Sequence, residues 1–111
     1  MKDVKVIRRN EAKVFMDEAE QCRHYITTSK ITFGTSRLLP GTRGGVDPGH
    51  NDGEEIFYVA KGSVICYFPK QNLHRELLEG DIVLIPPSEP HQLINEYSEE
   101  TVICWSLAPP D

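Results

Sequence analysis

Short segments of strand-forming residues, separated by turns rich in Gly and Pro, follow one another along most of this 111-residue chain. We expect about nine strands, at residues 4–8, 23–28, 31–39, 54–60, 63–68, 73–78, 82–85, 91–95 and 101–107. From residue 23 onward no helical pattern lies between successive strands, which argues against parallel βαβ units. A closed arrangement also removes most exposed strand edges. The pattern therefore predicts an all-β fold, either a sandwich or a small barrel.

Residues 10–22 are the only helix-like stretch, and Asn10 stands where a helix N-cap would be. The apolar residues Val14, Phe15 and Met16 are adjacent instead of spaced along one helical face. We therefore expect at most one short helix there. One turn of helix or an irregular segment fits the pattern equally well.

The length predicts one domain over residues 1–111, with a barrel core at about 31–107 preceded by strands and a connecting segment in 1–30. The net charge of −5 argues against nucleic acid or an anionic membrane surface as the main partner. No apolar run suits a signal peptide or a membrane span, so we expect a cytoplasmic protein. Three widely spaced cysteines indicate reduced thiols: Cys22, Cys66 and Cys104.

Two polar residues stand in phase with apolar neighbours in predicted strands. Period-two alternation places Glu55 on the same face as Phe57, and His91 on the same face as Leu93. A carboxylate is seldom buried without a partner, because its desolvation is costly. A metal ion or a strong hydrogen-bond partner would remove that cost.

Two motifs give the chain a resemblance to the cupin superfamily. The family's second motif reads G-x5-P-x-G-x2-H-x3-N, and this sequence matches it with Gly80, Pro86, His91 and Asn95, with Ser88 where glycine is usual. The resemblance extends over residues 31–107. It implies a double-stranded β-helix, also called a jelly-roll barrel.

The family's first motif, G-x5-H-x-H-x3-4-E-x6-G, is incomplete here. His50, Glu55 and Gly62 are in register, and Gly41 is one residue out of phase. Pro48 stands at the position of the family's first histidine, and its side chain cannot bind a metal.

The resemblance implies that one divalent metal ion (Fe, Mn, Ni, Co or Zn) is bound by His50, Glu55 and His91. A side-chain oxygen from the glycine-rich loop would fill the vacant ligand position, and the candidates are Asp47, Asn51 and Asp52. In the alternative, the metal site has degenerated and these side chains hydrogen-bond one another. The resemblance also implies a homodimer, for which residues 4–8 are the expected pairing or exchanging segment.

The function that we expect is Lewis-acid chemistry of the isomerase or lyase type on a polar small molecule, such as a sugar or carboxylic acid. Candidate proton-transfer residues are Tyr25, Glu54 and Tyr67, and candidate substrate-binding residues are Arg37, Phe57 and Asn95. Two alternatives stay open: a non-catalytic pocket that binds a small molecule, and an Fe(II) dioxygenase. The fold alone does not choose among them.

Overall fold

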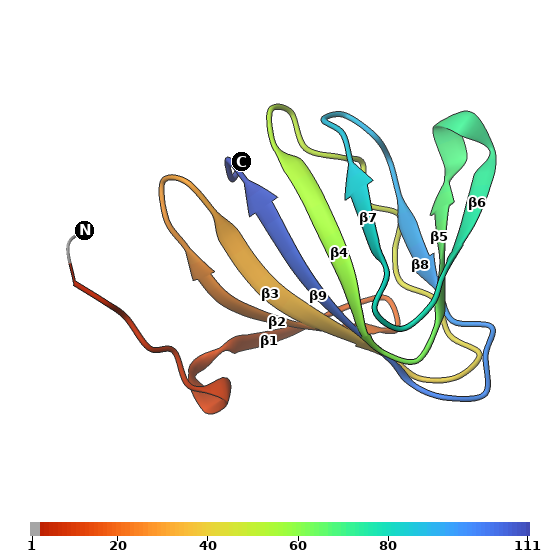
Figure 1. Ribbon diagram of the computed structural model, residues 1–111, viewed down its shortest axis with the longest axis horizontal. Helices are drawn as coiled ribbons and strands as arrows, with labels where there is room; N and C mark the ends of the chain where they lie inside the picture. The colour runs from red at the N-terminus through yellow and green to blue at the C-terminus, as the bar shows by residue number, and fades with distance from the viewer. Residues whose placement is uncertain (1–2) are drawn as a thin grey trace.

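The computed structural model describes residues 3–111, which form nine strands in two antiparallel sheets packed face to face (Figure 1). The six-stranded sheet, in the order β1-β2-β3-β9-β4-β7, contains β1 (Lys13–Asp17), β2 (Glu20–Thr27), β3 (Thr32–Leu38), β9 (Thr101–Ala108), β4 (Glu54–Lys61) and β7 (Ile82–Ile85). The three-stranded sheet, in the order β6-β5-β8, contains β6 (Leu73–Leu77), β5 (Val64–Phe68) and β8 (Gln92–Ile94). Two 3-10 turns complete the elements, η1 (Arg9–Glu11) and η2 (Pro69–Gln71). None of the helical segments among the described residues has the length and apolarity needed to cross a membrane.

The all-β prediction is confirmed, but the first strand is not the predicted one. Residues 4–8 belong to no strand of the described chain, and Val4 is 94% exposed. Most of the helix-like stretch 10–22 is instead β1, the turn to β2 and the start of β2, and its helical part is limited to η1. The reason is a hairpin whose two-residue turn is Glu18-Ala19, with Glu18 at a φ of 53°. Such turns usually carry Asn or Gly, so the sequence gives no hairpin signal here.

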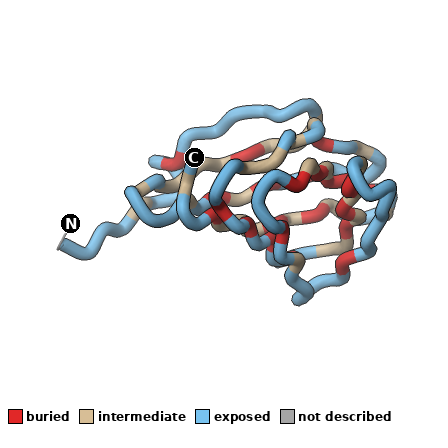
Figure 2. The backbone as a smooth tube through the Cα atoms, turned by 90° about the horizontal axis from the view of Figure 1, so that it is seen from above, coloured by how far each residue is buried: buried red, intermediate tan, exposed pale blue. Residues whose placement is uncertain are grey.

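The core lies between the two sheets and follows the predicted alternation. In β4 the buried residues are Glu55, Phe57 and Val59, while the residues between them face outward. Figure 2 shows the buried positions gathered between the sheets. The main apolar cluster is Leu38, Phe57, Val59, Val64, Cys66, Phe68, Leu77, Ile85, Leu93 and Ile103.

The long loop between β3 and β4 follows the free edge of β8. The Gly44 N–H donates to the Leu93 carbonyl at 2.9 Å, and isolated bridges join Arg43 to Ile94 and Asp47 to His91. The loop therefore adds to the three-stranded sheet without forming a regular strand. This pairing carries residues 47–50 to the cavity between the sheets.

Candidate metal centre

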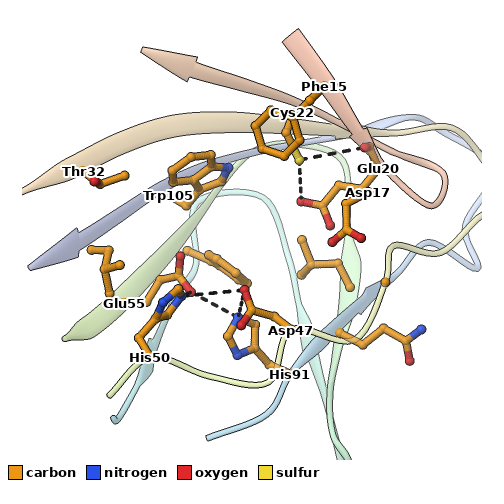
Figure 3. A pocket seen from close by; sticks show the side chains of 15 residues that line it. Phe15, Asp17, Glu20, Cys22, Thr32, Asp47, His50, Glu55, His91 and Trp105 are labelled. Carbon is orange, nitrogen blue, oxygen red and sulfur yellow. Dashed lines mark hydrogen bonds and ion pairs between the residues drawn. The ribbon is translucent and has the colours of Figure 1, made fainter. Parts of the chain in front are cut away.

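Four side chains from three separate segments converge at one end of the cavity (Figure 3). Asp47 and His50 come from the β3–β4 loop, Glu55 from the start of β4, and His91 from the residue before β8. Each offers one ligand atom, and the four atoms lie within 4.8 Å of one another. Two imidazoles and two carboxylates are a donor set suited to a divalent metal ion.

Backbone hydrogen bonds hold Asp47 beside His91. The Asp47 N–H donates to the His91 carbonyl at 2.8 Å, and the His91 N–H donates to the Asp47 carbonyl at 3.0 Å. Within the loop, Oδ1 of Asp47 accepts from the Gly49 N–H at 2.8 Å. Gly49 has a φ of 96°, and a Cβ there would lie 2.8 Å from the Glu89 backbone nitrogen. Its missing side chain lets the two loops touch, and Oδ2 of Asp47 is left for the histidines.

Both histidines are oriented by an acceptor at Nδ1. For His91 the acceptor is the Glu89 carbonyl at 2.9 Å, and for His50 it is Oδ2 of Asp111 at 2.5 Å. An acceptor at Nδ1 places the ring proton there, so the lone pair of a neutral ring is on Nε2. Metal-binding histidines have this outer partner almost without exception. Both Nε2 atoms face Glu55 and Asp47.

The distances among the donor atoms fit a shared cation. Oε1 of Glu55 lies 3.4 Å from Nε2 of His50 and 3.1 Å from Nε2 of His91. Oδ2 of Asp47 lies 3.7 Å from each of these nitrogens. Ligands about 2.1 Å from one ion, at angles of 90° to 109°, would be roughly 3.0–3.4 Å apart. The Glu55 distances lie within this range, and those of Asp47 are slightly longer.

Two of these atoms are buried without a hydrogen bond among the described residues. They are Nε2 of His50 and Oε1 of Glu55, and the Glu55 side chain is only 8% exposed. A buried polar atom without a partner costs about 1–3 kcal/mol. Such atoms seldom persist in native proteins unless an ion or a water molecule satisfies them. The residues present therefore fit a metal ion.

The acidic neighbours also set the charge of the histidines. Burial by itself lowers the pKa of His50, but the hydrogen bond to Asp111 and the charges of Glu55 and Asp47 outweigh it and raise the pKa above its usual value. For His91 burial is again outweighed, by Glu55, the Glu89 carbonyl and Asp47, and the pKa is raised. Protons therefore compete with a metal for both rings.

The cavity beside the four side chains measures about 250 Å³, close to the lower end of the range for small-molecule sites. Phe57 forms part of its wall and meets the His91 ring edge to face at 5.5 Å between centroids. Trp105 on β9 is the cross-strand partner of Phe57 and continues the same wall. The far side of the cavity is lined from β1 and β2 by Phe15, Asp17, Glu20 and Cys22.

Of the three candidates for the vacant ligand position, the structure brings only Asp47 into the cluster. Asn51 and Asp52 are exposed in the loop that follows. Asp47 is next in sequence to Pro48, and it is the residue that pairs with His91. A carboxylate from the residue before Pro48 thus joins the two histidines and Glu55.

Two of the three predicted substrate-binding residues lie elsewhere. Arg37 is on the outer side of β3, where Nε donates to Oε2 of Glu100 at 2.6 Å. Asn95 is fully buried, and its Nδ2 donates to the carbonyls of Leu38 at 3.1 Å and Glu99 at 2.9 Å. Arg37 and Asn95 therefore stabilise loops and strands instead of facing the cavity. Of the three predicted substrate-binding residues, only Phe57 lines the cavity.

None of the three predicted proton-transfer residues lines the cavity. Tyr25 packs against Phe33, with ring centroids 6.1 Å apart, and Tyr67 stacks on His74 at 4.3 Å. Glu54 is exposed at the start of β4, because its side chain points away from that of Glu55. In β2 and β4 the cavity-lining residues lie on the other face of the strand, whereas β5, which carries Tyr67, contributes none.

The sequence analysis missed Glu20, Cys22 and Trp105 as cavity residues. The pattern Glu20-x-Cys22 has the two-residue period of a strand face, but it lies in the stretch with helix-like composition. Recognising the hairpin of β1 and β2 would have placed both side chains on one face. Only the structure shows that this face lies across the cavity from the four candidate metal ligands.

The comparisons with known proteins agree with the fold. A family model described as "Cupin domain" matches residues 34–107. No curated protein matches the sequence.

Several solved structures are similar in fold. A predicted oxalate decarboxylase from Thermotoga maritima has a TM-score of 0.78 and 16% identity over 96% of this chain and all of its own. The polyketide cyclase RemF from Streptomyces resistomycificus has a TM-score of 0.73 and 19% identity over 97% of this chain and 81% of its own. CENP-C from Drosophila melanogaster, in a structure bound to CAL1, has a TM-score of 0.75 and 17% identity over 90% and 82%. At these identities the likeness establishes the fold and leaves the reaction open.

Proposed function

Because the chain belongs to the cupin domain family, we propose that it is a metal-dependent enzyme acting on a polar small molecule, such as a sugar or a carboxylic acid. The reaction is of the isomerase or lyase type. The observation that carries the proposal is the pair of buried atoms without hydrogen bonds, Nε2 of His50 and Oε1 of Glu55, at the centre of four metal-type ligands.

A divalent ion bound by Asp47, His50, Glu55 and His91 would supply Lewis-acid chemistry, polarising a carbonyl or hydroxyl oxygen of the substrate. The rest of the reaction falls to the chain itself. The aromatic walls formed by Phe57 and Trp105 exclude water from one side of the cavity. Gln92, also in the lining, donates its amide N–H to the Gly44 carbonyl at 2.9 Å, and its side-chain oxygen would accept from a polar group of the substrate.

A non-catalytic pocket with a degenerate metal site is the second candidate. In that case the four side chains would satisfy one another by hydrogen bonds. With neutral rings, Nε2 of His50 and Oε1 of Glu55 have no hydrogen bond, which favours the metal. A protonated His91 would instead pair with Oε1 of Glu55 across 3.1 Å, which is the arrangement that the non-catalytic pocket requires. Two carboxylates and two imidazoles also suit Fe(II). The identity of the bound metal therefore distinguishes the Fe(II) dioxygenase from the isomerase or lyase.

The test is elemental analysis of protein purified without chelator or histidine tag. We expect about one equivalent of a divalent metal per chain, and its loss in H91A. The matched control is H74A, because His74 is on β6 and stacks on Tyr67, away from the cluster. Less than about a tenth of an equivalent in the wild-type protein, even after incubation with Fe, Mn, Ni, Co or Zn salts, would favour the non-catalytic pocket.

We also propose that the protein forms a homodimer. Two pairs of apolar side chains on the outer side of β4 and β7 support it, Ile56 with Leu84 and Tyr58 with Ile82, which we call the outer patch. Their exposed fractions range from 38% to 55%. Exposed apolar patches on soluble proteins commonly mark interaction sites.

Light scattering coupled to size exclusion tests the dimer. We expect L84K to shift the protein towards the monomer and L39K to leave it unchanged. Leu39 is a fair control, because it is 51% exposed, against 53% for Leu84, and lies outside the outer patch. A wild-type protein that is monomeric at all concentrations would contradict the proposal.

A further inference from the structure

We propose that Glu20 transfers protons to and from the substrate in this cavity. The substrate is a small carbonyl compound with a C–H bond next to the carbonyl group. This role rests on the function proposed above. Glu20 begins β2 and lines the same cavity as the metal cluster, on the opposite wall (Figure 3). A substrate held at the cluster would have the Glu20 carboxyl on its far side.

Two side chains donate hydrogen bonds to the Glu20 carboxyl, and a third side chain holds one of these donors. The indole Nε1–H of Trp105 donates to Oγ of Ser36 at 3.0 Å, and the Ser36 hydroxyl donates to Oε2 of Glu20. The Cys22 thiol donates to the same oxygen at 3.4 Å. Oε1 accepts no hydrogen bond from the described residues, so it is the oxygen that remains for a substrate.

Close packing against the β3–β4 loop keeps Oε1 in this position. A Cβ on Gly44 would overlap Oε1 of Glu20, so the glycine provides the space that the carboxyl occupies. The Gly44 N–H is itself bonded to the Leu93 carbonyl on β8, which fixes the loop. Both oxygens of Glu20 are therefore held before any substrate binds.

The surroundings favour the proton-carrying form of this carboxyl. Burial raises the pKa of Glu20, the hydrogen bonds from Ser36 and Cys22 and the charge of His91 lower it, and Asp17 raises it, with a net pKa above the usual range. A carboxyl whose pKa lies closer to neutrality is the better proton-transfer group. Burial and the nearby Glu20 raise the pKa of Cys22 to about 12, so the thiol acts as a donor and not as a nucleophile.

The proton-transfer step needs no partner other than the substrate and Glu20. The C–H bond next to the carbonyl breaks, its proton passes to Oε1 of Glu20, and its electron pair forms the C=C bond of an enolate. The carbonyl oxygen takes the negative charge. Where the first carbon carries a hydroxyl, as in dihydroxyacetone, the hydroxyl proton passes to the carbonyl oxygen, and return of the carbon-bound proton to the former carbonyl carbon isomerises the substrate. Return to the first carbon after exchange with solvent only replaces hydrogen by deuterium, and this is the sole outcome for pyruvate.

Hydrogen–deuterium exchange is therefore the assay. The Zn²⁺-loaded protein is incubated in D₂O with pyruvate or dihydroxyacetone, and loss of the C–H signal is followed by proton NMR. We expect E20Q to lose at least about 100-fold in exchange rate, the usual scale for a general base. The matched control is E18Q, an exposed glutamate in the same hairpin that does not line the cavity, which should exchange at the wild-type rate.

A second measurement needs no substrate and no metal. Carbon-13 NMR of metal-free protein labelled at glutamate carboxyls should show one group, absent in E20Q, that titrates above the usual range for glutamate. In S36A its pKa should rise further, since the Ser36 hydrogen bond lowers it. Titration of Glu20 in the ordinary range would overturn the proposal.

The outcomes separate the two proposals. Zinc content equal to that of the wild type shows that E20Q is folded with its metal centre intact. With that content unchanged, exchange by E20Q at the wild-type rate would overturn the role of Glu20 alone. No exchange by the fully loaded wild-type protein would overturn the reaction type proposed above, and the role of Glu20 with it.

Discussion

Asp47 and His91 lie side by side both in their backbones and in their side chains, which belong to the candidate metal centre. Their backbones exchange two hydrogen bonds, of 2.8 and 3.0 Å, and Oδ2 of Asp47 lies 3.7 Å from Nε2 of His91. Residues 44 positions apart in sequence are thereby held in fixed register. Pro48 offers no ligand atom, and the preceding residue brings a carboxylate into the group of side chains that could hold a metal ion.

The first prediction concerns Asp47 as a ligand. Loss of its carboxylate in D47A should weaken Zn²⁺ binding by at least about 10–100-fold, the loss that follows removal of even an outer-shell partner. Isothermal titration of the metal-free protein with ZnCl₂ measures this. D52A, which removes an exposed carboxylate from the same loop, should bind as the wild type does. Equal affinities of D47A and wild type would reduce the ligand set to three.

The second prediction concerns Asp111, which accepts the Nδ1–H of His50. D111A should weaken Zn²⁺ binding by about 10–100-fold, because the acceptor orients the ring and increases its basicity. D111N keeps an acceptor oxygen without the charge, so its affinity should lie between those of D111A and wild type. A D111A protein that binds zinc with wild-type affinity would show that His50 is held in other ways.

The third prediction is a fall in stability of the metal-free protein as the pH rises. The pKa values of His50 and His91 are raised above 6.5 in the folded state, so the folded state binds more protons than the unfolded state above that pH. Their contribution is complete below pH 6.5 and is lost as the pH rises through the folded pKa values. The pKa of Glu20 is also raised in the folded state, so this carboxyl likewise lowers the stability as the pH rises above its unfolded pKa.

Urea denaturation between pH 6 and pH 9 checks the sign of this effect. In the double variant H50Q/H91Q the free energy of unfolding should decline much less between pH 6 and pH 9. Saturating Zn²⁺ should reverse the trend, since metal binding requires deprotonated rings and strengthens as the pH rises. A metal-free protein that becomes more stable over this range would contradict the histidine environments described above.

The fourth prediction concerns Gly34, which packs under the Trp105 ring. A Cβ there would overlap the ring and lie 2.5 Å from the Arg23 carbonyl oxygen, and that oxygen belongs to the backbone and cannot swing away. G34A should therefore lower the free energy of unfolding by roughly 1–3 kcal/mol. It should also shift the fluorescence of Trp105, the only tryptophan in the chain. Urea denaturation followed by that fluorescence measures both effects.

A double-mutant cycle gives the control. In a W105L background the ring is gone, so G34A should cost less than it does alone, with a coupling free energy of about 0.5 kcal/mol or more. Additive effects would show that the Arg23 carbonyl, and not the indole, limits the space at Gly34.

Much of the architecture follows from local features of the sequence. Alternation places Glu55 with Phe57 on the inner face of β4, and the structure buries both. Eight of the nine strands lie where the residue pattern puts them, and Gly or Pro marks the turns that follow β3, β4, β5, β6 and β7. The strand that was not predicted is β1, whose two-residue turn to β2 has neither residue. There, pairing along five residue positions outweighs the helix-like composition.

The sequence by itself determined the inward-facing glutamate of β4, the two histidines at loop–strand junctions, and the all-β class. Period-two alternation and turn chemistry act over a few neighbouring residues, and both are readable from the chain. Only the tertiary structure decided that Asp47, and not Asn51 or Asp52, joins the histidines, and that Glu20 faces them across the cavity. These choices depend on the pairing of the β3–β4 loop with β8 and on the hairpin of β1 and β2. Contacts between segments distant in sequence set both, and no local pattern encodes them.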